Sequence, residues 1–216
     1  MTDRWRWTVA GITLLGGGLA VISSVPGAWY GYIPGDSYVF DPVRFSPLWI
    51  QRTLLPLFSL AAGFGLLVGV GALVYRDWAH RRLHRVGGTA TVLGGLTLLC
   101  GLYGPEFLTP HGTPVGVVAS LAALALLLWG GVLLLVGGPL LAYSYLRAGR
   151  VWLGWTLLGT LPVVLLLGAL LPGWIGDLGS SMPILVLGIV IGRDLLVREP
   201  VPEFGVDLSG DRDDGV

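Results

Sequence analysis

Six long apolar stretches constrain this chain more than any other feature of its sequence. The hydrocarbon core of a bilayer is about 30 Å thick, so a helix needs about 20 apolar residues to cross it. The first five stretches contain no charged residue, and only the sixth carries Arg193 and Asp194 near its end, where we expect both at the membrane surface. The stretches cover about residues 7–25, 53–75, 86–103, 115–143, 152–171 and 178–197.

The composition agrees with a chain embedded in a membrane. Charged residues make up 12% of the 216 residues, whereas soluble domains carry about 25%. The sequence therefore predicts an all-α, polytopic integral membrane protein with six transmembrane helices in a bundle of antiparallel hairpins. It excludes an ordinary globular protein of the cytosol.

Two parts of the chain are expected to behave differently. Residues 1–198 form the six-helix transmembrane domain, whereas the acidic tail 199–216 has too few apolar residues to fold alone and is expected to be disordered in the cytoplasm. The first stretch could also be a cleaved signal peptide, because a basic start precedes its apolar run. Its length and the interruption by Pro26 favour an uncleaved first helix.

The arginines predict the orientation of the six helices. If the N-terminus is cytoplasmic, eleven of the thirteen arginines lie on the inner side, and only Arg44 and Arg52 lie outside. Cytoplasmic loops carry an excess of basic residues, so we predict that both termini are cytoplasmic. We expect the protein to lie in the plasma membrane. Tryptophan also favours membrane surfaces, and in this topology eight of the nine tryptophans fall near a boundary. The exception is Trp129.

The centres of the six stretches lack the residue types that usually carry transport or catalysis inside a membrane. Ionisable residues inside a membrane mark ion and proton pathways, and none lies in the middle of a stretch, which argues against a proton-coupled carrier or an intramembrane metalloprotease. The single Cys100 excludes a cysteine-based metal site, and no nucleotide-binding or zinc motif is present. His80 and His84 could share a helix face as two metal ligands, but further ligands are missing. We therefore expect no metal and no cofactor.

A possible site lies in the loops predicted on the outer side. If the hairpins form a bundle, six polar residues of these loops could meet above one mouth. Carboxylates with a histidine could bind a hard cation or act in general acid–base chemistry, although the spacing matches no known motif. The alternative, which we favour, is that they are ordinary loop residues facing water. The six are Asp36, Asp41, Arg52, Glu106, His111 and Asp177.

Small residues and prolines predict where helices pack or bend. Small residues at four-residue spacing let helices approach closely, either within the chain, which we favour, or at a dimer seam. Pro162 should kink the fifth helix, as static packing or as a hinge, and Gly137-Gly138-Pro139 should bend or end the fourth. The packing residues are Ala61, Gly65, Gly69, Gly188 and Gly192.

The function class is predicted only coarsely. The scarcity of buried polar groups favours a non-catalytic accessory or structural subunit of a membrane complex. A transporter or channel for a small solute is the first alternative, and an outer-facing enzyme acting on lipid is the second. The expected partners are the lipid bilayer and, for a subunit of a complex, another membrane protein or a second copy of the chain. The basic residues form no clustered face of the kind that binds nucleic acid.

Overall fold

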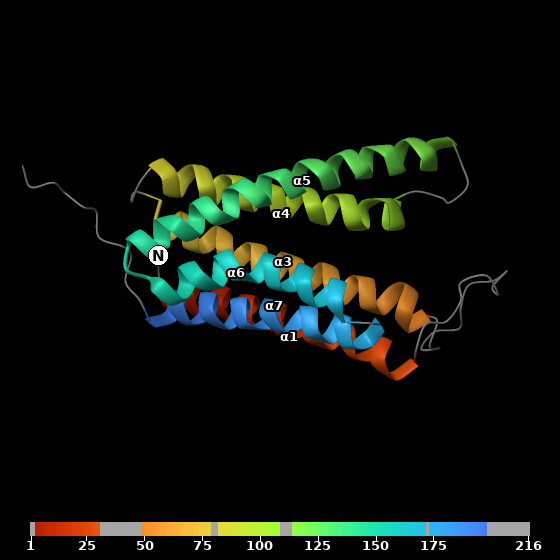
Figure 1. Ribbon diagram of the computed structural model, residues 1–216, viewed down its shortest axis with the longest axis horizontal. Helices are drawn as coiled ribbons and strands as arrows, with labels where there is room; N and C mark the ends of the chain where they lie inside the picture. The colour runs from red at the N-terminus through yellow and green to blue at the C-terminus, as the bar shows by residue number, and fades with distance from the viewer. Residues whose placement is uncertain (1–2, 31–48, 79–81, 109–113, 172, 198–216) are drawn as a thin grey trace, which may run out of the picture.

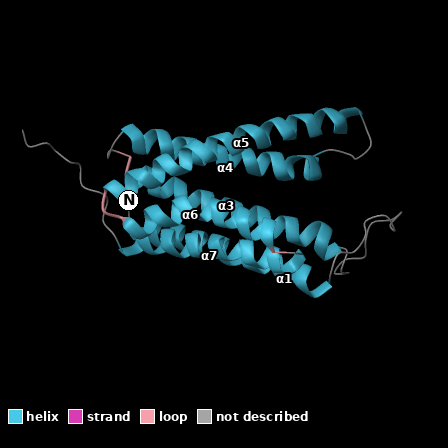
Figure 2. Ribbon diagram, in the orientation of Figure 1, coloured by secondary structure: helices cyan, strands magenta, loops and turns pink. Residues whose placement is uncertain are grey.

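The computed structural model describes residues 3–30, 49–78, 82–108, 114–171 and 173–197. These residues form six α-helices and one turn of π-helix, and no strand occurs among them. Figure 2 shows this all-helical architecture. The elements are α1 (Asp3–Tyr30), η2 (Ile50–Leu54), α3 (Leu55–Arg76), α4 (Arg82–Leu108), α5 (Pro114–Arg147), α6 (Val151–Leu170) and α7 (Gly173–Val197).

Each of the six α-helices is long and apolar enough to span a membrane. Four of the six predicted stretches lie within these helices, the second begins two residues before α3 in the π-helical turn, and the fifth ends one residue after α6. The expectation that Gly137-Gly138-Pro139 might end its helix is wrong, because α5 continues through Pro139 to Arg147. A proline removes one backbone hydrogen bond, and neighbouring helices can compensate for the loss within a bundle. The acidic tail and most of the long loop after α1 lie outside the described residues.

The helices surround a common interior. Neighbouring pairs run in the order α1–α3–α4–α5–α6–α7, and α7 packs back on α1. Since α3 and α7 also touch each other, the three helices α1, α3 and α7 are in mutual contact. The α4–α5 pair lies close to the other helices at the end of the bundle that carries the N-terminus and diverges from them towards the opposite end (Figure 1).

We call the first of these ends the arginine end, because Arg6, Arg76 and Arg150 lie there, and the other the serine end, after Ser24 and Ser181. The largest buried side chains lie in the half of the bundle next to the arginine end. Leu73 of α3, Leu141 and Tyr145 of α5, and Leu195 of α7 are almost completely buried in one apolar cluster. The tightest packing of the bundle is therefore at the end where the helices converge.

Glycines set the distance between α4 and α5. Gly87, Gly94 and Gly101 repeat every seven residues on α4, and Gly130 and Gly137 do so on α5. A Cβ atom on Gly94 would lie 2.9 Å from the Cβ of Leu133, and one on Gly137 would lie 2.6 Å from the backbone nitrogen of Thr91. Side chains therefore cannot replace these hydrogens without moving the helices apart.

The small residues predicted from the sequence lie mostly against α1. A Cβ atom on Gly65 would lie 2.9 Å from the Cα of Gly16, and one on Gly188 would lie 3.2 Å from the Cα of Gly17. Gly69 faces Thr13, and Gly192 faces Leu14. Ala61 is exposed.

Candidate functional site

The arginine end contains a buried network of four charged side chains. Arg76 donates from Nε and Nη2 to the two carboxylate oxygens of Asp77, at 3.0 Å each, and from Nη2 to Oδ2 of Asp194 at 2.7 Å. Arg150 donates from Nη1 to Oδ2 of Asp194 at 2.5 Å and to Oδ2 of Asp77 at 3.3 Å. All four side chains are at most 6% exposed. Two positive and two negative charges thus neutralise each other inside the bundle.

A glycine turn places Arg150 in this network. Gly149 follows α5 with a φ of +75°, a left-handed conformation that glycine adopts without the strain of a Cβ. The N–H of Arg150 donates to the carbonyl of Tyr145 at 2.9 Å, and that of Gly149 donates to Leu146 at 3.1 Å. This is the Schellman pattern that ends many helices. It turns the chain back across the end of α5, so that Arg150 enters the bundle just before α6 begins.

The network also closes the C-terminal end of α7. The last four carbonyls of a helix lack partners within the helix. Arg76 donates to the carbonyl of Asp194 at 2.9 Å, and Arg6 of α1 donates to the carbonyls of Leu195 at 2.9 Å and Leu196 at 3.3 Å. Arginines at this position also interact favourably with the helix dipole. Three separate helices are thereby joined at one point.

Tyr145 and His84 extend the network to α4 and α5. The hydroxyl of Tyr145 donates to Oδ2 of Asp77 at 3.2 Å. The ring of His84 packs edge-on against Tyr145, with ring centres 5.0 Å apart, and its Nδ1 lies 3.0 Å from the hydroxyl of Ser144. Five of the six α-helices therefore contribute a side chain to this end of the bundle, and the sixth, α6, begins directly after Arg150. The arrangement joins helices rather than exposing a reactive group.

The sequence analysis missed this network. It assigned Arg76 and Arg150 only to orientation and Asp194 only to the membrane surface, and it did not foresee that Asp194, which is 6% exposed, lies buried among the helices. The available signal was the pair of acids Asp77 and Asp194, each directly after an arginine in the sequence. Arginines that only set the orientation do not need acidic neighbours, so the acids indicate ion pairs. His84 is part of the packing at this end, and His80 lies outside the described residues.

The outer-loop cluster predicted from the sequence lies mostly beyond the part of the chain that the structure describes. Asp36, Asp41 and His111 fall there, and the side chains of Arg52 and Glu106 are not described either. Asp177, the remaining member, is exposed near the start of α7 and lines a pocket of about 400 Å³ at the serine end. The described groups of His, Cys, Asp and Glu form no cluster of three or more that could hold a metal.

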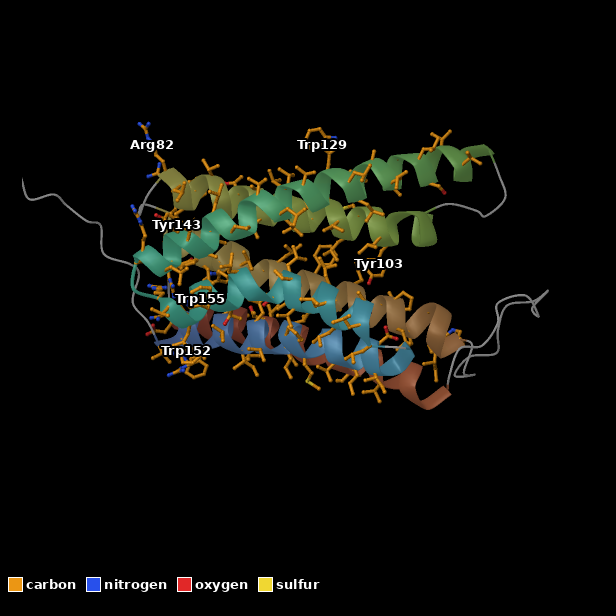
Figure 3. The ribbon with its side chains drawn as sticks, viewed as in Figure 1. Arg82, Tyr103, Trp129, Tyr143, Trp152 and Trp155 are labelled. Atoms are coloured by element: carbon orange, nitrogen blue, oxygen red, sulfur yellow. The ribbon has the colours of Figure 1, made fainter. Side chains whose placement is uncertain are left out.

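The serine-end pocket is polar on one side. Its hydroxyls come from Ser23 and Ser24 of α1, Ser59 of α3, and Ser180 and Ser181 of α7. Tyr103 projects towards it from α4 (Figure 3) and contributes to its wall. The oxygens of Ser24 and Ser181 lie 3.1 Å apart, which joins α1 to α7 at this end.

A second space of about 330 Å³, open rather than enclosed, lies between α3, α4, α5, α6 and α7, and we call it the interior cavity. Its lining is almost entirely leucine, valine, isoleucine and glycine, with Thr91 and Thr160 as exceptions. Pro162 lies inside α6 close to this lining, but its own side chain is exposed on the outer surface of the helix.

No family model matches the chain, and neither the curated proteins nor the solved structures contain a match to it.

Proposed function

We propose that this chain is a multi-pass protein of the cell membrane that acts as a non-catalytic accessory or structural subunit of a membrane complex. In this proposal the six helices cross the bilayer as antiparallel hairpins and both termini are cytoplasmic. The paired charges at the arginine end support it, because they join the helices into one stable unit. The excess of arginines there supports the cytoplasmic placement of that end.

The observation that carries the proposal is Trp129. Exposed tryptophans at the arginine end, such as Trp152 and Trp155, lie where a membrane surface would be (Figure 3). Trp129 instead lies midway along α5, points away from the bundle and is 66% exposed. Hydrocarbon offers no partner to its indole N–H, so a protein that supplies an acceptor there would be favoured over lipid.

The surroundings of Trp129 have the form of a helix-packing surface. Apolar side chains repeat at three- and four-residue spacing along the exposed side of α5, which is the stripe that another helix would cover. All of them are more than one-third exposed. Together with Trp129, the stripe consists of Val118, Ala122, Ala125, Val132 and Val136.

The test is purification of the intact protein in mild detergent, with the mass and composition of the complex determined by native mass spectrometry. We expect one partner chain at fixed stoichiometry with the wild type and with Trp152→Leu, whose tryptophan is also exposed. We expect the partner to be lost from Trp129→Leu. A wild type that purifies only as a monomer or homodimer contradicts the proposal.

The interior cavity favours a second candidate, a transporter or channel for a small apolar solute. Its lining includes Leu102 of α4 and Val70 of α3. The hydroxyls of Thr91 and Thr160 donate to carbonyls of their own helices, so the lining suits an apolar solute. Flux of an apolar solute into liposomes that depends on the protein would support this candidate. The lipid-enzyme alternative depends on Glu106 and His111, whose side chains are not described.

A further inference from the structure

The serine-end pocket and the interior cavity adjoin each other. Gly63 and Leu66 of α3 and Ile184 of α7 line both of them. A molecule that occupied both would therefore have one end among hydroxyls and a carboxylate and the other among leucines. The combined space falls within the range of about 300–1,000 Å³ that is typical of ligand sites.

Three serine hydroxyls and one carboxylate of the polar part offer hydrogen-bond acceptors. Ser23 donates its hydroxyl proton to the carbonyl of Ala20 at 2.9 Å, Ser180 to that of Asp177 at 3.0 Å, and Ser181 to that of Leu178 at 2.8 Å. With these protons engaged, the oxygens face the pocket as acceptors. The carboxylate of Asp177 adds an acceptor with negative charge. Among the described residues that line this pocket there is no basic side chain.

The apolar part offers almost no polar contact. Thr91 donates to the carbonyl of Gly87 at 2.7 Å and Thr160 to that of Thr156 at 2.6 Å, so both hydroxyls are engaged within their own helices. The remaining walls come from leucine, valine, isoleucine and glycine on five helices. A hydrocarbon chain can enter such a space without loss of hydrogen bonds.

We infer that these two spaces form one binding site for an amphiphile with a single inserted hydrocarbon chain and an amine-bearing head group. The chain occupies the interior cavity between α3, α4, α5, α6 and α7. The ammonium donates to the serine oxygens and pairs with Asp177 at the serine end. This site is independent of the accessory role, because it lies inside the bundle and not on the exposed side of α5.

Gly138 provides a variant that fills the cavity. Gly138 lines the cavity, and a Cβ atom placed on it meets no atom within 4 Å, so Gly138→Leu adds a side chain to open space. Gly131 is the matched control, because it lies on the same helix, also has open space at its Cβ position, and is not part of the cavity lining. Asp177→Asn removes the charge of the polar part while keeping its shape.

The experiment uses the full chain in phosphatidylcholine nanodiscs, since that head group has no hydrogen-bond donor. The probe is radiolabelled tetradecylamine, with tetradecanoate as the anionic probe of equal chain length and with empty nanodiscs subtracted. We expect saturable binding of one amine per protein chain and weaker binding of the carboxylate. Gly138→Leu should lower the amine affinity about tenfold or more, Gly131→Leu should leave it unchanged, and Asp177→Asn should lower it about two- to fivefold.

Tetradecylamine with a photoreactive group at mid-chain provides a second measurement on the wild type, which does not depend on the folding of a variant. We expect crosslinks to residues of the cavity, such as Leu98 and Leu161. Competition by an aminophospholipid would support a bilayer lipid as the source of the ligand, and its failure to compete would support a single-chain amphiphile. Equal affinities for the amine and the carboxylate, unchanged binding by Gly138→Leu, or crosslinks only to the outer surface would overturn the proposal.

Discussion

At the scale of single residues, the molecule depends on four buried charges that satisfy one another. Burying a charge costs several kcal/mol, and the cost is offset only when partners and geometry are good. Asp194 accepts from both Arg76 and Arg150, and Asp77 accepts from the same two arginines. Each carboxylate is therefore held by two cations, and the loss of any one member leaves an excess charge inside the bundle.

Removal of one member should destabilise the protein strongly. We expect Asp194→Leu to lower the free energy of unfolding by about 3–5 kcal/mol, because two arginines then share one carboxylate. The double variant Arg150→Met with Asp194→Leu should lose less than Asp194→Leu alone, since the neutral pair of Arg76 and Asp77 remains. The measurement is denaturant unfolding in mixed micelles, with exposed Arg193→Met as the control. If the double variant loses as much free energy of unfolding as Arg150→Met and Asp194→Leu lose separately when summed, the network is contradicted.

Gly149 should be sensitive for a different reason. Its φ of +75° is unfavourable for residues with a Cβ by about 1–2 kcal/mol. We expect Gly149→Ala to lower the free energy of unfolding by about that amount, and Gly149→Asn to lower it less, since asparagine tolerates this conformation better. Equal stability of Gly149→Ala and the wild type would show that the turn before Arg150 is not left-handed.

At the scale of the elements, the helices were largely predictable and their contacts were not. Apolar length predicted all six helices that are long and apolar enough to span a membrane, because hydropathy needs no tertiary information. The sequence left open whether Gly137-Gly138-Pro139 bends or ends its helix, and α5 continues through Pro139 because the bundle tolerates a lost hydrogen bond. The ion network was not predicted because its members lie far apart in the sequence, with Arg76 and Asp194 separated by 118 residues. Of the predicted outer-loop cluster, only Asp177 can be placed, at the mouth of the serine-end pocket.

The close approach of α4 and α5 gives a prediction at this scale. We expect Gly94→Leu to lower the thermal midpoint of unfolding clearly, because its side chain would meet Leu133 and the backbone of Leu134. Overpacking of this kind costs about 1–3 kcal/mol. Gly131→Leu on α5 has open space at its Cβ position and should change the midpoint little. If both variants unfold at the same temperature, the glycine contact between the two helices is not present.

At the scale of the whole molecule, the two ends of the bundle differ in character. The arginine end is joined by paired charges, while the serine end is lined with hydroxyls and adjoins an apolar interior. In the proposed topology the arginine end faces the cytoplasm and the serine end faces the outside. The accessory role and the amphiphile site both require a chain that crosses the bilayer in this way.

The most direct test of this account is the accessibility of single cysteines in intact cells. In a Cys100→Ala background, Asp177→Cys places a thiol at the serine end and Arg82→Cys places one at the arginine end, and both positions are exposed. We predict that a membrane-impermeant maleimide labels Asp177→Cys in intact cells and Arg82→Cys only after permeabilisation. Labelling of both from the same side would contradict a membrane-spanning bundle, and the reverse pattern would contradict its orientation.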